Sequence, residues 1–481
     1  MQRLRNKWFL FLGVAAILGI VVRFYHIKYP VADWHSWRQA DTAAVARNFL
    51  KFGIDPSRPR YDDLSNIQSG KDNPNGWRMV EFPIYQLVSV YLYKAVPRFP
   101  IEFWLRVVSI VSTGGSIVLL GYLLVEIVSP LAGVFGAFLY AFLPFSIYYG
   151  RAILPDPFGT FCALLSLALL WKSGNKGQSW FYLIMAAVAG GIGVLVRPME
   201  IFVLTPGVYL LIRNKSVKDS IIRTLIYGII LSGPLLVWRH WIANFPEGIP
   251  VSDWLYNKDN IRFKGAWFYW LFANRLGDLM LGYWGLILFG IGLISKSNKK
   301  DLIFSLLWLV GGLSYFIVFA GGNVQHDYYQ ALVIPIVVWF SAKGIYWLTQ
   351  KTEGISRFGS WTLALVSCIF IFAFSWYTIR TYFWINRPEI VTAGKAADAL
   401  LPKNAKVIAP YNGDTSFLYQ INRQGWPEGF DIAKKIEMGA GYYVTVSPTD
   451  KDTETRDLAN TYTVLVRNDS YAIIDLTHKK K

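Results

Sequence analysis

Residues 131–149 read LAGVFGAFLYAFLPFSIYY, a run without a charged side chain. A hydrocarbon core of roughly 30 Å needs about 20 apolar residues in one helix, so this run predicts a membrane-spanning helix. Together with a first run at 8–22, similar segments predict an all-α polytopic membrane protein with about eleven spans. The other runs lie at 103–127, 157–171, 180–196, 201–212, 221–241, 279–294, 302–320, 329–347 and 361–377.

The composition agrees with a membrane location. Of 481 residues, 54% are hydrophobic and only 16% are charged, whereas a soluble domain carries about 25% charged residues. Lys and Arg number 48 against 31 Asp and Glu, a net charge of +17. In a membrane protein this excess is typical of cytoplasmic loops beside anionic lipid, so we expect a lipid bilayer and no nucleic acid as partner. The two cysteines, Cys162 and Cys368, lie in apolar runs, which excludes a disulfide framework and a cysteine-ligated zinc site.

The basic loops predict the orientation of the spans. The run at 8–22 follows three basic residues and precedes no small-residue cleavage site, so we expect an uncleaved span with a cytoplasmic N-terminus. The segment 82–96 is ambiguous, because it is apolar but contains proline and several polar residues. If it lies along the outer surface without spanning, four basic loops fall on the cytoplasmic side, as the positive-inside rule requires. These loops carry Lys172/Lys176, Arg213/Lys215/Lys218, Lys296/Lys299/Lys300 and Lys351/Arg357.

This orientation predicts three hydrophilic segments on the outer face: residues 24–81, 242–278 and the tail. The tail has alternating runs at 406–410, 442–446, 462–466 and 471–474, and a helical pattern at 390–401. Such patterns predict a small α/β domain. We therefore expect a membrane core at 1–386, with interfacial helices in its first outer loop at 24–81, and an extracytoplasmic domain at 387–481.

The first outer loop reads VADWHSWRQADT at 31–42 and continues as AAVARNFL at 43–50. The second part has helical spacing, which places Asp41 at or near the start of an interfacial helix. An aspartate there can be a simple helix cap, and tryptophans are common at membrane interfaces. However, carboxylates beside aromatic rings also suit a sugar, with its hydroxyls and apolar faces. The candidate residues of this loop are Asp33, Trp34, His35, Trp37, Arg38 and Asp41.

A second acid, Asp156, lies between prolines in LPDPF at 154–158, at the predicted outer end of a span. An ionisable residue at the mouth of a span is a functional candidate, although a helix cap is the simpler alternative. Arg151 can pair with Asp156 or bind a phosphate through its planar guanidinium. Arg197, His326 and Asp327 are expected at the same outer level, and this shared level makes them candidate substrate-binding residues.

Several other chemistries have no motif here. The chain has no P-loop, no G-x-G-x-x-G at the start of a helix, no H-E-x-x-H and no G-x-S-x-G. Without an ATP site, energy must come from an activated substrate or from a gradient. No metal-ligand spacing is present, so we predict no metal site and no certain cofactor, although two carboxylates could bind a divalent cation.

The layout and short motifs resemble the C-type glycosyltransferases, specifically the bacterial relatives of protein O-mannosyltransferases and lipid A aminoarabinose transferases. The similar features are the uncleaved first span, the acidic outer loop leading into a helix that ends ARNFL at 46–50, LPDPF at 154–158, many spans and a small outer tail domain. The resemblance implies transfer of a sugar from a polyprenyl-phosphate donor to a glycolipid, glycan or protein acceptor. It also implies the bacterial plasma membrane, with the tail domain outside.

In that family a carboxylate of the first loop lies beside the acceptor, and an acid matching Asp156 lies in the same cavity. The first acid is often part of an adjacent acidic pair, but here Asp33 and Asp41 are separated; either can be the general base, and we favour Asp41 for its place beside the helix. The sequence EFP at 81–83 has Phe82 where aminoarabinose transferases carry lysine, which argues against lipid A as acceptor.

The expected reaction inverts the anomeric centre. The base accepts the acceptor's hydroxyl proton, while Arg151, Arg197 or His326 holds the phosphate and Asp156 binds sugar hydroxyls or positions a cation. A transporter or flippase of a glycolipid is the main alternative, and inverted repeats with helix breaks would favour it, but none is visible. A structural protein would account for the tail domain but not for the acids.

Overall fold

The computed structural model describes residues 2–175, 179–350, 356–449 and 451–480. Lys176 and Lys351, two residues of the predicted basic loops, lie outside these ranges. The chain folds into two compact units. The first, here called the helical unit, comprises residues 1–27, 106–239 and 252–382; the second, here called the mixed unit, comprises 28–105, 240–251 and 383–481.

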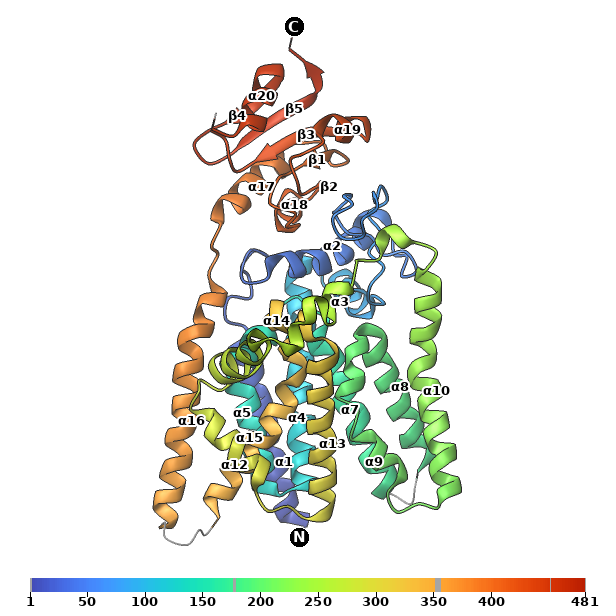
Figure 1. The fold of residues 1–481 in the computed structure, drawn as a ribbon, viewed down its shortest axis with the longest axis vertical. Coiled ribbons are helices and arrows are strands. Elements are labelled where there is room, and N and C mark those ends of the chain that lie inside the picture. Colours follow the sequence, from blue (N-terminus) through green and yellow to red (C-terminus); the bar gives the residue numbers. More distant parts are fainter. Residues whose placement is uncertain (1, 176–178, 351–355, 450, 481) are drawn as a thin grey trace. The chain divides into compact units, whose positions relative to one another are not determined.

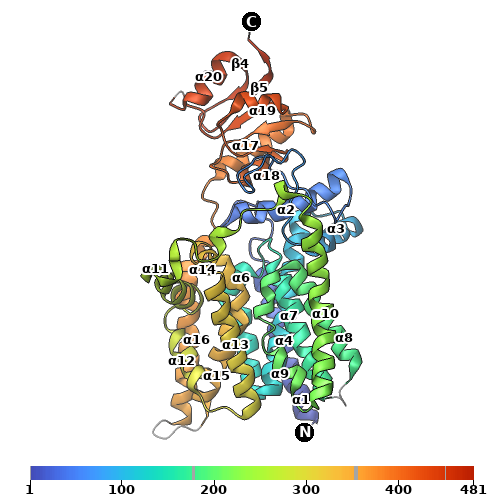
Figure 2. The same cartoon turned by 45° about the vertical axis from the view of Figure 1, so that its right-hand side comes forward.

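Long helices run side by side through the helical unit (Figures 1 and 2). Among the neighbouring pairs are α7 with α8, α12 with α15, and α1 with α5. The helices α4 and α10 each extend past the boundary of the unit at one end. The helices of this part are α1 (Gln2–Arg23), α4 (Ile101–Ile127), α5 (Pro130–Phe142), α6 (Pro144–Tyr149), α7 (Asp156–Asn175), α8 (Trp180–Val196), η1 (Pro198–Phe202), α9 (Gly207–Ile212), α10 (Val217–Ile242), η3 (Asp253–Leu255), η4 (Lys258–Phe263), α11 (Gly265–Phe268), η5 (Tyr269–Met280), α12 (Gly285–Ile294), α13 (Lys299–Val318), α14 (Ala320–Gln325), η6 (Asp327–Val333), α15 (Ile334–Thr349), α16 (Arg357–Ile379) and η7 (Arg380–Phe383).

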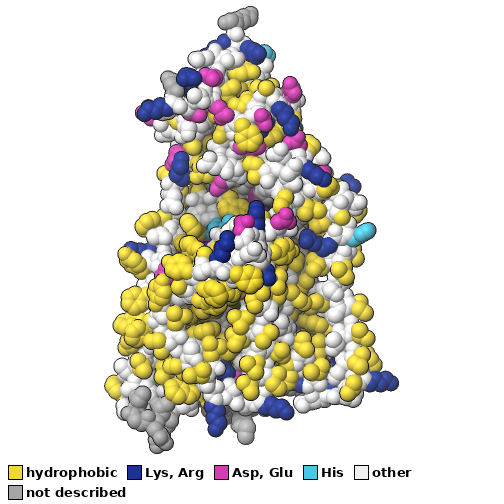
Figure 3. Space-filling view, viewed as in Figure 1, with side chains coloured by type: hydrophobic (Ala, Val, Ile, Leu, Met, Phe, Trp, Pro, Cys, Tyr) yellow, Lys and Arg dark blue, Asp and Glu magenta, His cyan; other side chains and the backbone are white. Residues whose placement is uncertain are grey.

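The surface of these helices is apolar, as a lipid environment requires. Hydrophobic side chains cover most of the visible face over the long helices (Figure 3). Within the described residues, five helices are long and apolar enough to cross a membrane, or up to six if the bent pair Gly265–Met280 and Gly285–Ile294 forms one span. A multi-pass membrane protein is thus supported, whereas the number of about eleven spans stays a prediction.

Prolines interrupt two of the predicted spans. The predicted helix at 131–149 is two helices, α5 and α6, because Pro144 cannot donate a backbone hydrogen bond and pushes Leu143 to a ψ of 118°. The predicted span at 201–212 is equally wrong as one helix: η1 ends at Phe202, and α9 begins only after Pro206. Apolar length therefore predicted helices in both segments but not the breaks within them.

Glycines allow two helices of this unit to approach closely. A Cβ atom added at Gly292 of α12 would lie 1.8 Å from the carbonyl oxygen of Phe340, and one at Gly344 of α15 would lie 1.9 Å from that of Leu288. Small residues at such crossings are typical of helices packed in lipid, where close van der Waals contact drives association. No larger residue fits at either position without separating α12 from α15.

The mixed unit contains the predicted small sheet of the tail. Its strand order is β2-β1-β3-β5-β4; β1 runs parallel to β2 and β3, and β5 runs antiparallel to β3 and β4. The alternating runs correspond to β1, β3, β4 and β5, while the short β2 was not predicted. The elements of this unit are α2 (Ser36–Phe52), α3 (Ile84–Ala95), η2 (Pro246–Gly248), α17 (Pro388–Leu400), β1 (Lys406–Ile408), α18 (Ser416–Ile421), β2 (Gly425–Trp426), α19 (Ile432–Glu437), β3 (Ala440–Thr445), α20 (Thr453–Thr461), β4 (Tyr462–Arg467) and β5 (Ala472–Lys479).

The first loop belongs to the same unit as the tail. Its residues 62–64 lie along the edge of β2, where the Gly425 amide donates to the Asp62 carbonyl (2.9 Å) and the Leu64 amide donates to the Gly425 carbonyl (2.8 Å). This pairing covers a sheet edge that would otherwise expose unpaired backbone groups. The ambiguous segment 82–96 forms α3, whose 12 residues extend about 18 Å, too short to cross a bilayer of roughly 30 Å.

Candidate functional site

The start of α2 presents the first group of candidate residues. The helix begins at Ser36, five residues before Asp41, so Asp41 lies near the helix start, in the second turn, and is not its N-cap. His35 precedes the helix with φ 53° and ψ 37°, a left-handed conformation that costs energy for a residue other than glycine. The helix α2 is therefore preceded by a strained residue, His35, which belongs to the motif at 31–42.

Asp33 is held by the amide of Gln39. The residue is only 4% exposed, and its Oδ1 accepts a hydrogen bond from Gln39 Nε2 at 2.7 Å. The same nitrogen donates to the carbonyl oxygen of Trp34 at 3.0 Å. Trp34 itself is 38% exposed, with its ring 5.1 Å from that of His35. A buried acid and a partly exposed aromatic ring thus lie next to each other in the chain, and a sugar-binding surface at this place stays a prediction.

Asp41 has both carboxylate oxygens engaged. It is 1% exposed. Oδ1 accepts a hydrogen bond from the Thr415 hydroxyl at 2.7 Å, and Oδ2 lies 3.1 Å from the Arg78 guanidinium and 3.3 Å from Gln68 Nε2. Three donors around one buried carboxylate hold the side chain in place. This arrangement fits an anchoring role for Asp41.

Arg38 binds Glu81. One guanidinium nitrogen of Arg38 lies 3.1 and 3.2 Å from the two carboxylate oxygens. Burial raises the pKa of Glu81, but the positive charges of Arg38 and Arg78 outweigh it, so the pKa lies below the ordinary value. Trp37 is half-buried on the same turn of α2. Sequence reasoning missed four polar residues of this group. Gln68, Arg78 and Thr415 lie outside the motif at 31–42, and Gln39 lies within it but carries no charge that would have singled it out.

The helical unit holds a second group, centred on Asp156 at the start of α7. The guanidinium of Arg197 contacts its carboxylate, and both residues are buried. Glu200 is 0% exposed and accepts a hydrogen bond from the Thr160 hydroxyl at 2.9 Å. Arg197 also lies 5.4 Å from the centre of the Tyr329 ring. The structure thus brings two of the predicted residues, Asp156 and Arg197, into direct contact and adds an unpredicted acid beside them.

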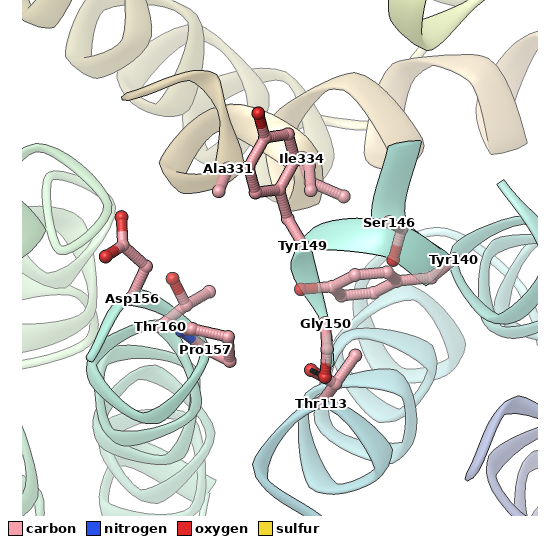
Figure 4. Close-up of a pocket in the computed structure, with 10 residues that line it drawn as sticks. All are labelled: Thr113, Tyr140, Ser146, Tyr149, Gly150, Asp156, Pro157, Thr160, Ala331 and Ile334. Carbon is pink, nitrogen blue, oxygen red and sulfur yellow. Dashed lines mark hydrogen bonds between the residues drawn. The ribbon is translucent and has the colours of Figure 1, made fainter. Parts of the chain in front are cut away.

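A small cavity borders this group (Figure 4). Asp156 and Thr160 lie on one side of it, on α7, and Tyr149 lies across from them on α6. Its volume of about 20 Å³ is enough for one water molecule. Six of its ten lining residues are polar, which is the chemistry that holds water inside a helical bundle: Thr113, Tyr140, Ser146, Tyr149, Asp156 and Thr160.

The remaining candidates make contacts within the helical unit. Asp327 accepts hydrogen bonds from the hydroxyls of Tyr149, at 2.6 Å, and Tyr382. Arg151 donates to the carbonyl of His26 at 3.3 Å. The His326 ring lies 5.4 Å from that of Trp254. The expectation that these residues share a membrane level with the first-loop acids stays a prediction. Within the described ranges, no group of three or more His, Cys, Asp or Glu side chains could hold a metal ion.

The raised pKa of Asp63, a buried acid of the first loop, predicts that the stability of the folded chain depends on pH. Asp63 is fully buried beside the edge of β2, and burial raises its pKa from 3.8 to about 7, although hydrogen bonds from Ser65 act against this. The folded chain keeps this proton between pH 4 and 7 while the unfolded chain releases it, so stability falls as the pH rises through that window and is constant above it. The difference in pKa corresponds to at most about 4 kcal/mol.

The Asp63→Asn variant should remove this contribution. Asparagine cannot ionise but still accepts the hydrogen bond from the Ser65 amide, so the loss of stability between pH 5 and pH 8 should become smaller. Thermal unfolding in detergent at both pH values measures the difference. Asp72→Asn, which alters an exposed carboxylate of the same loop, should behave as the wild type. An unchanged slope in Asp63→Asn would show that Asp63 is not protonated in the folded state.

Comparisons with known proteins agree with this architecture. Residues 92–238 match the family described as dolichyl-phosphate-mannose-protein mannosyltransferase. Solved structures with similar folds include those of ArnT, AglB and AftD. The crystal structure of ArnT from Cupriavidus metallidurans, bound to undecaprenyl phosphate, aligns over 97% of both chains with a TM-score of 0.67 and 12% identity.

The other two structures are larger proteins. The oligosaccharyltransferase AglB from Archaeoglobus fulgidus, in complex with an inhibitory peptide and a dolichol-phosphate, aligns over 96% of this chain and 73% of its own, with a TM-score of 0.58 and 11% identity. The arabinofuranosyltransferase AftD from Mycobacteria aligns over 97% of this chain and 41% of its own, with a TM-score of 0.59 and 12% identity. No curated protein matches the sequence significantly.

Proposed function

We propose that this chain, which has the fold of the C-type glycosyltransferases related to mannosyltransferases and aminoarabinose transferases, transfers a sugar from a polyprenyl-phosphate donor to a lipid, glycan or protein acceptor. The observation that carries the proposal is the buried acid Asp33 beside the exposed ring of Trp34, in a chain with this fold. The family match at 92–238 and the undecaprenyl phosphate bound to ArnT support a lipid-linked donor.

The proton acceptor is Asp33 in this proposal. Asp41, the other first-loop candidate, already accepts from Thr415 and Gln68 and pairs with Arg78, so it is suited to organising the loop. The Asp33 carboxylate takes the proton of the acceptor hydroxyl while that oxygen attacks the anomeric carbon. The bond from this carbon to the phosphate oxygen breaks on the opposite face, and polyprenyl phosphate leaves with the bonding pair. The anomeric centre is inverted, and general base catalysis of this kind contributes about 10²–10⁴-fold.

The leaving phosphate needs fixed cationic or polar donors. Arg151, Arg197 and His326 are the candidates in the helical unit, and a guanidinium can donate two parallel hydrogen bonds to a phosphate. Arg197 already contacts Asp156, so in this proposal Asp156 positions Arg197, while Arg151 and His326 supply the remaining contacts. On the acceptor side, Trp34 offers a face for the apolar side of a sugar, and His35, Trp37 and Arg38 border it in the chain.

A transfer assay tests the proposal against the alternative of a transporter or flippase. Purified protein is mixed with labelled polyprenyl-phosphate sugars and a membrane lipid extract, and labelled product is separated from the donor. A glycosyltransferase forms a covalent product and releases polyprenyl phosphate. A transporter moves the label across the bilayer of a vesicle without changing its covalent attachment, and that result would overturn the proposed function.

The distribution of basic residues predicts which face of a bacterial plasma membrane carries the tail. We expect the start of α13 to be cytoplasmic and the tail to be outside, because that orientation satisfies the positive-inside rule. Single cysteines at Lys299 and Asp469, both exposed, in a background without Cys162 and Cys368, should label oppositely with an impermeant thiol reagent on intact cells. Labelling of both cysteines from outside would contradict this orientation.

A further inference from the structure

The segment that carries Asp33 is held by contacts from the tail. Gln420 of α18 donates from Nε2 to the carbonyl oxygen of Val31 at 2.9 Å, two residues before Asp33. At the other end, the Thr415 hydroxyl lies 2.7 Å from Asp41 Oδ1 and 3.3 Å from the carbonyl oxygen of Trp37. A hydroxyl has one hydrogen, and the shorter distance assigns it to Asp41. Residues 31–41 are thus held near both ends by side chains from the tail.

The α18 helix is itself firmly placed against α2. Arg47 of α2 donates to the carbonyl oxygen of Tyr419 at 2.8 Å and lies 3.8 Å from the centre of its ring. The other end of the same guanidinium pairs with Asp62 at 2.5 Å. Phe417 and Leu418 of α18 are fully buried in the core of the tail. Movement of α18 would therefore break both the tail core and the contacts to the first loop.

Residues 31–41 contain a strained backbone conformation, so contacts from other parts of the unit are needed to hold them in place. The left-handed conformation of His35 costs energy and persists only where surrounding contacts determine it. No side chain caps the start of α2 at this residue. Within the segment, Gln39 fixes Asp33 and the Trp34 carbonyl, but Gln39 lies on the same helix and cannot place that helix in the unit. Contacts from outside the helix do so: Glu81 and Arg78 of the first loop hold Arg38 and Asp41, and Thr415 and Gln420 of the tail hold Asp41 and Val31.

We propose that Gln420 and Thr415 are positioning residues for the transfer reaction: by holding Val31 and Asp41, they keep the Asp33 carboxylate where it can accept the proton of the acceptor hydroxyl. This inference rests on the proposed function. It assigns the tail a role in catalysis that needs no contact of the tail with either substrate. Misplacement of a reacting group by about 1 Å can lower a rate by up to a hundredfold, so loss of either contact should lower turnover.

The test compares Gln420→Leu and Thr415→Val with Lys434→Ala. The first two variants keep the approximate side-chain volume but remove the donor. Lys434 also links the tail to the first loop, through an exposed ion pair with Asp72 at 2.7 Å, but it does not touch residues 31–41. We expect kcat to fall between about tenfold and a hundredfold in Gln420→Leu and Thr415→Val, with KM for the donor changed by less than about threefold, and no change in Lys434→Ala. Thr415→Ser, which restores the hydroxyl, should restore kcat.

Hydrogen–deuterium exchange gives a second measurement that needs no substrate. Peptides covering residues 31–41 should exchange faster in Gln420→Leu and Thr415→Val than in the wild type and in Lys434→Ala, while peptides from β3 and β5 remain protected. Wild-type kcat in both donor-free variants would overturn the positioning role. If the wild type itself transfers no sugar, the proposed function fails, and the exchange comparison still decides whether the tail restrains the segment.

Discussion

Replacement of Asp33 by asparagine should lower sugar transfer by at least about a hundredfold without changing the unfolding temperature, because a general base contributes about 10²–10⁴-fold. Asparagine keeps the size of the side chain and an oxygen that accepts the hydrogen bond from Gln39, but it cannot take a proton. Initial rates with labelled donor and thermal unfolding in detergent are the two measurements. Asp55→Asn, an exposed position of the same loop, is the matched control and should keep the wild-type rate.

The parallel variant Asp41→Asn should behave differently. Its amide nitrogen would face donors, either Thr415 on one side or Arg78 and Gln68 on the other. A buried polar group left without a suitable partner costs about 1–3 kcal/mol, so we expect a lower unfolding temperature together with any loss of rate. If Asp33→Asn transfers sugar normally and Asp41→Asn is inactive but fully stable, Asp41 rather than Asp33 is the general base.

Replacement of Arg197 by methionine should destabilise the protein by about 3–5 kcal/mol, because it leaves Asp156 buried without its cation. The double variant Arg197→Met/Asp156→Asn should recover most of the stability, since both charges are then absent. Arg380→Met, which removes an exposed arginine, should have little effect.

Arg197 can be a structural partner of Asp156 or a ligand of the donor phosphate. Binding of the labelled donor to the same variants distinguishes these two roles. A structural cation predicts that the double variant, once stable, binds the donor nearly as well as the wild type. A phosphate ligand predicts that the double variant is stable but has lost donor affinity, while Arg380→Met has not. An unchanged unfolding temperature in Arg197→Met would contradict the buried ion pair.

Local patterns in the sequence predicted much of the architecture. Uninterrupted apolar runs predicted long helices such as α4 and α13, because one helix must satisfy its own backbone in lipid. Alternation of apolar and polar residues predicted β1, β3, β4 and β5 in the tail, and the fold as a whole is similar to that of ArnT. The break at Pro144 was missed, because hydropathy averages over a proline although its ring ends the hydrogen bonding of α5.

The sequence by itself determined the membrane character of the chain, the types of its main elements and the acidic motif of the first loop, because these depend on short-range periodicity and composition. Only the tertiary structure decided what each acid binds. Asp41 meets Thr415 at a sequence separation of 374 residues, and the Val31 carbonyl meets Gln420 at a separation of 389. No local pattern encodes such contacts, since they arise when the tail folds against the first loop, and they determine which distant residues hold Asp41 and Val31.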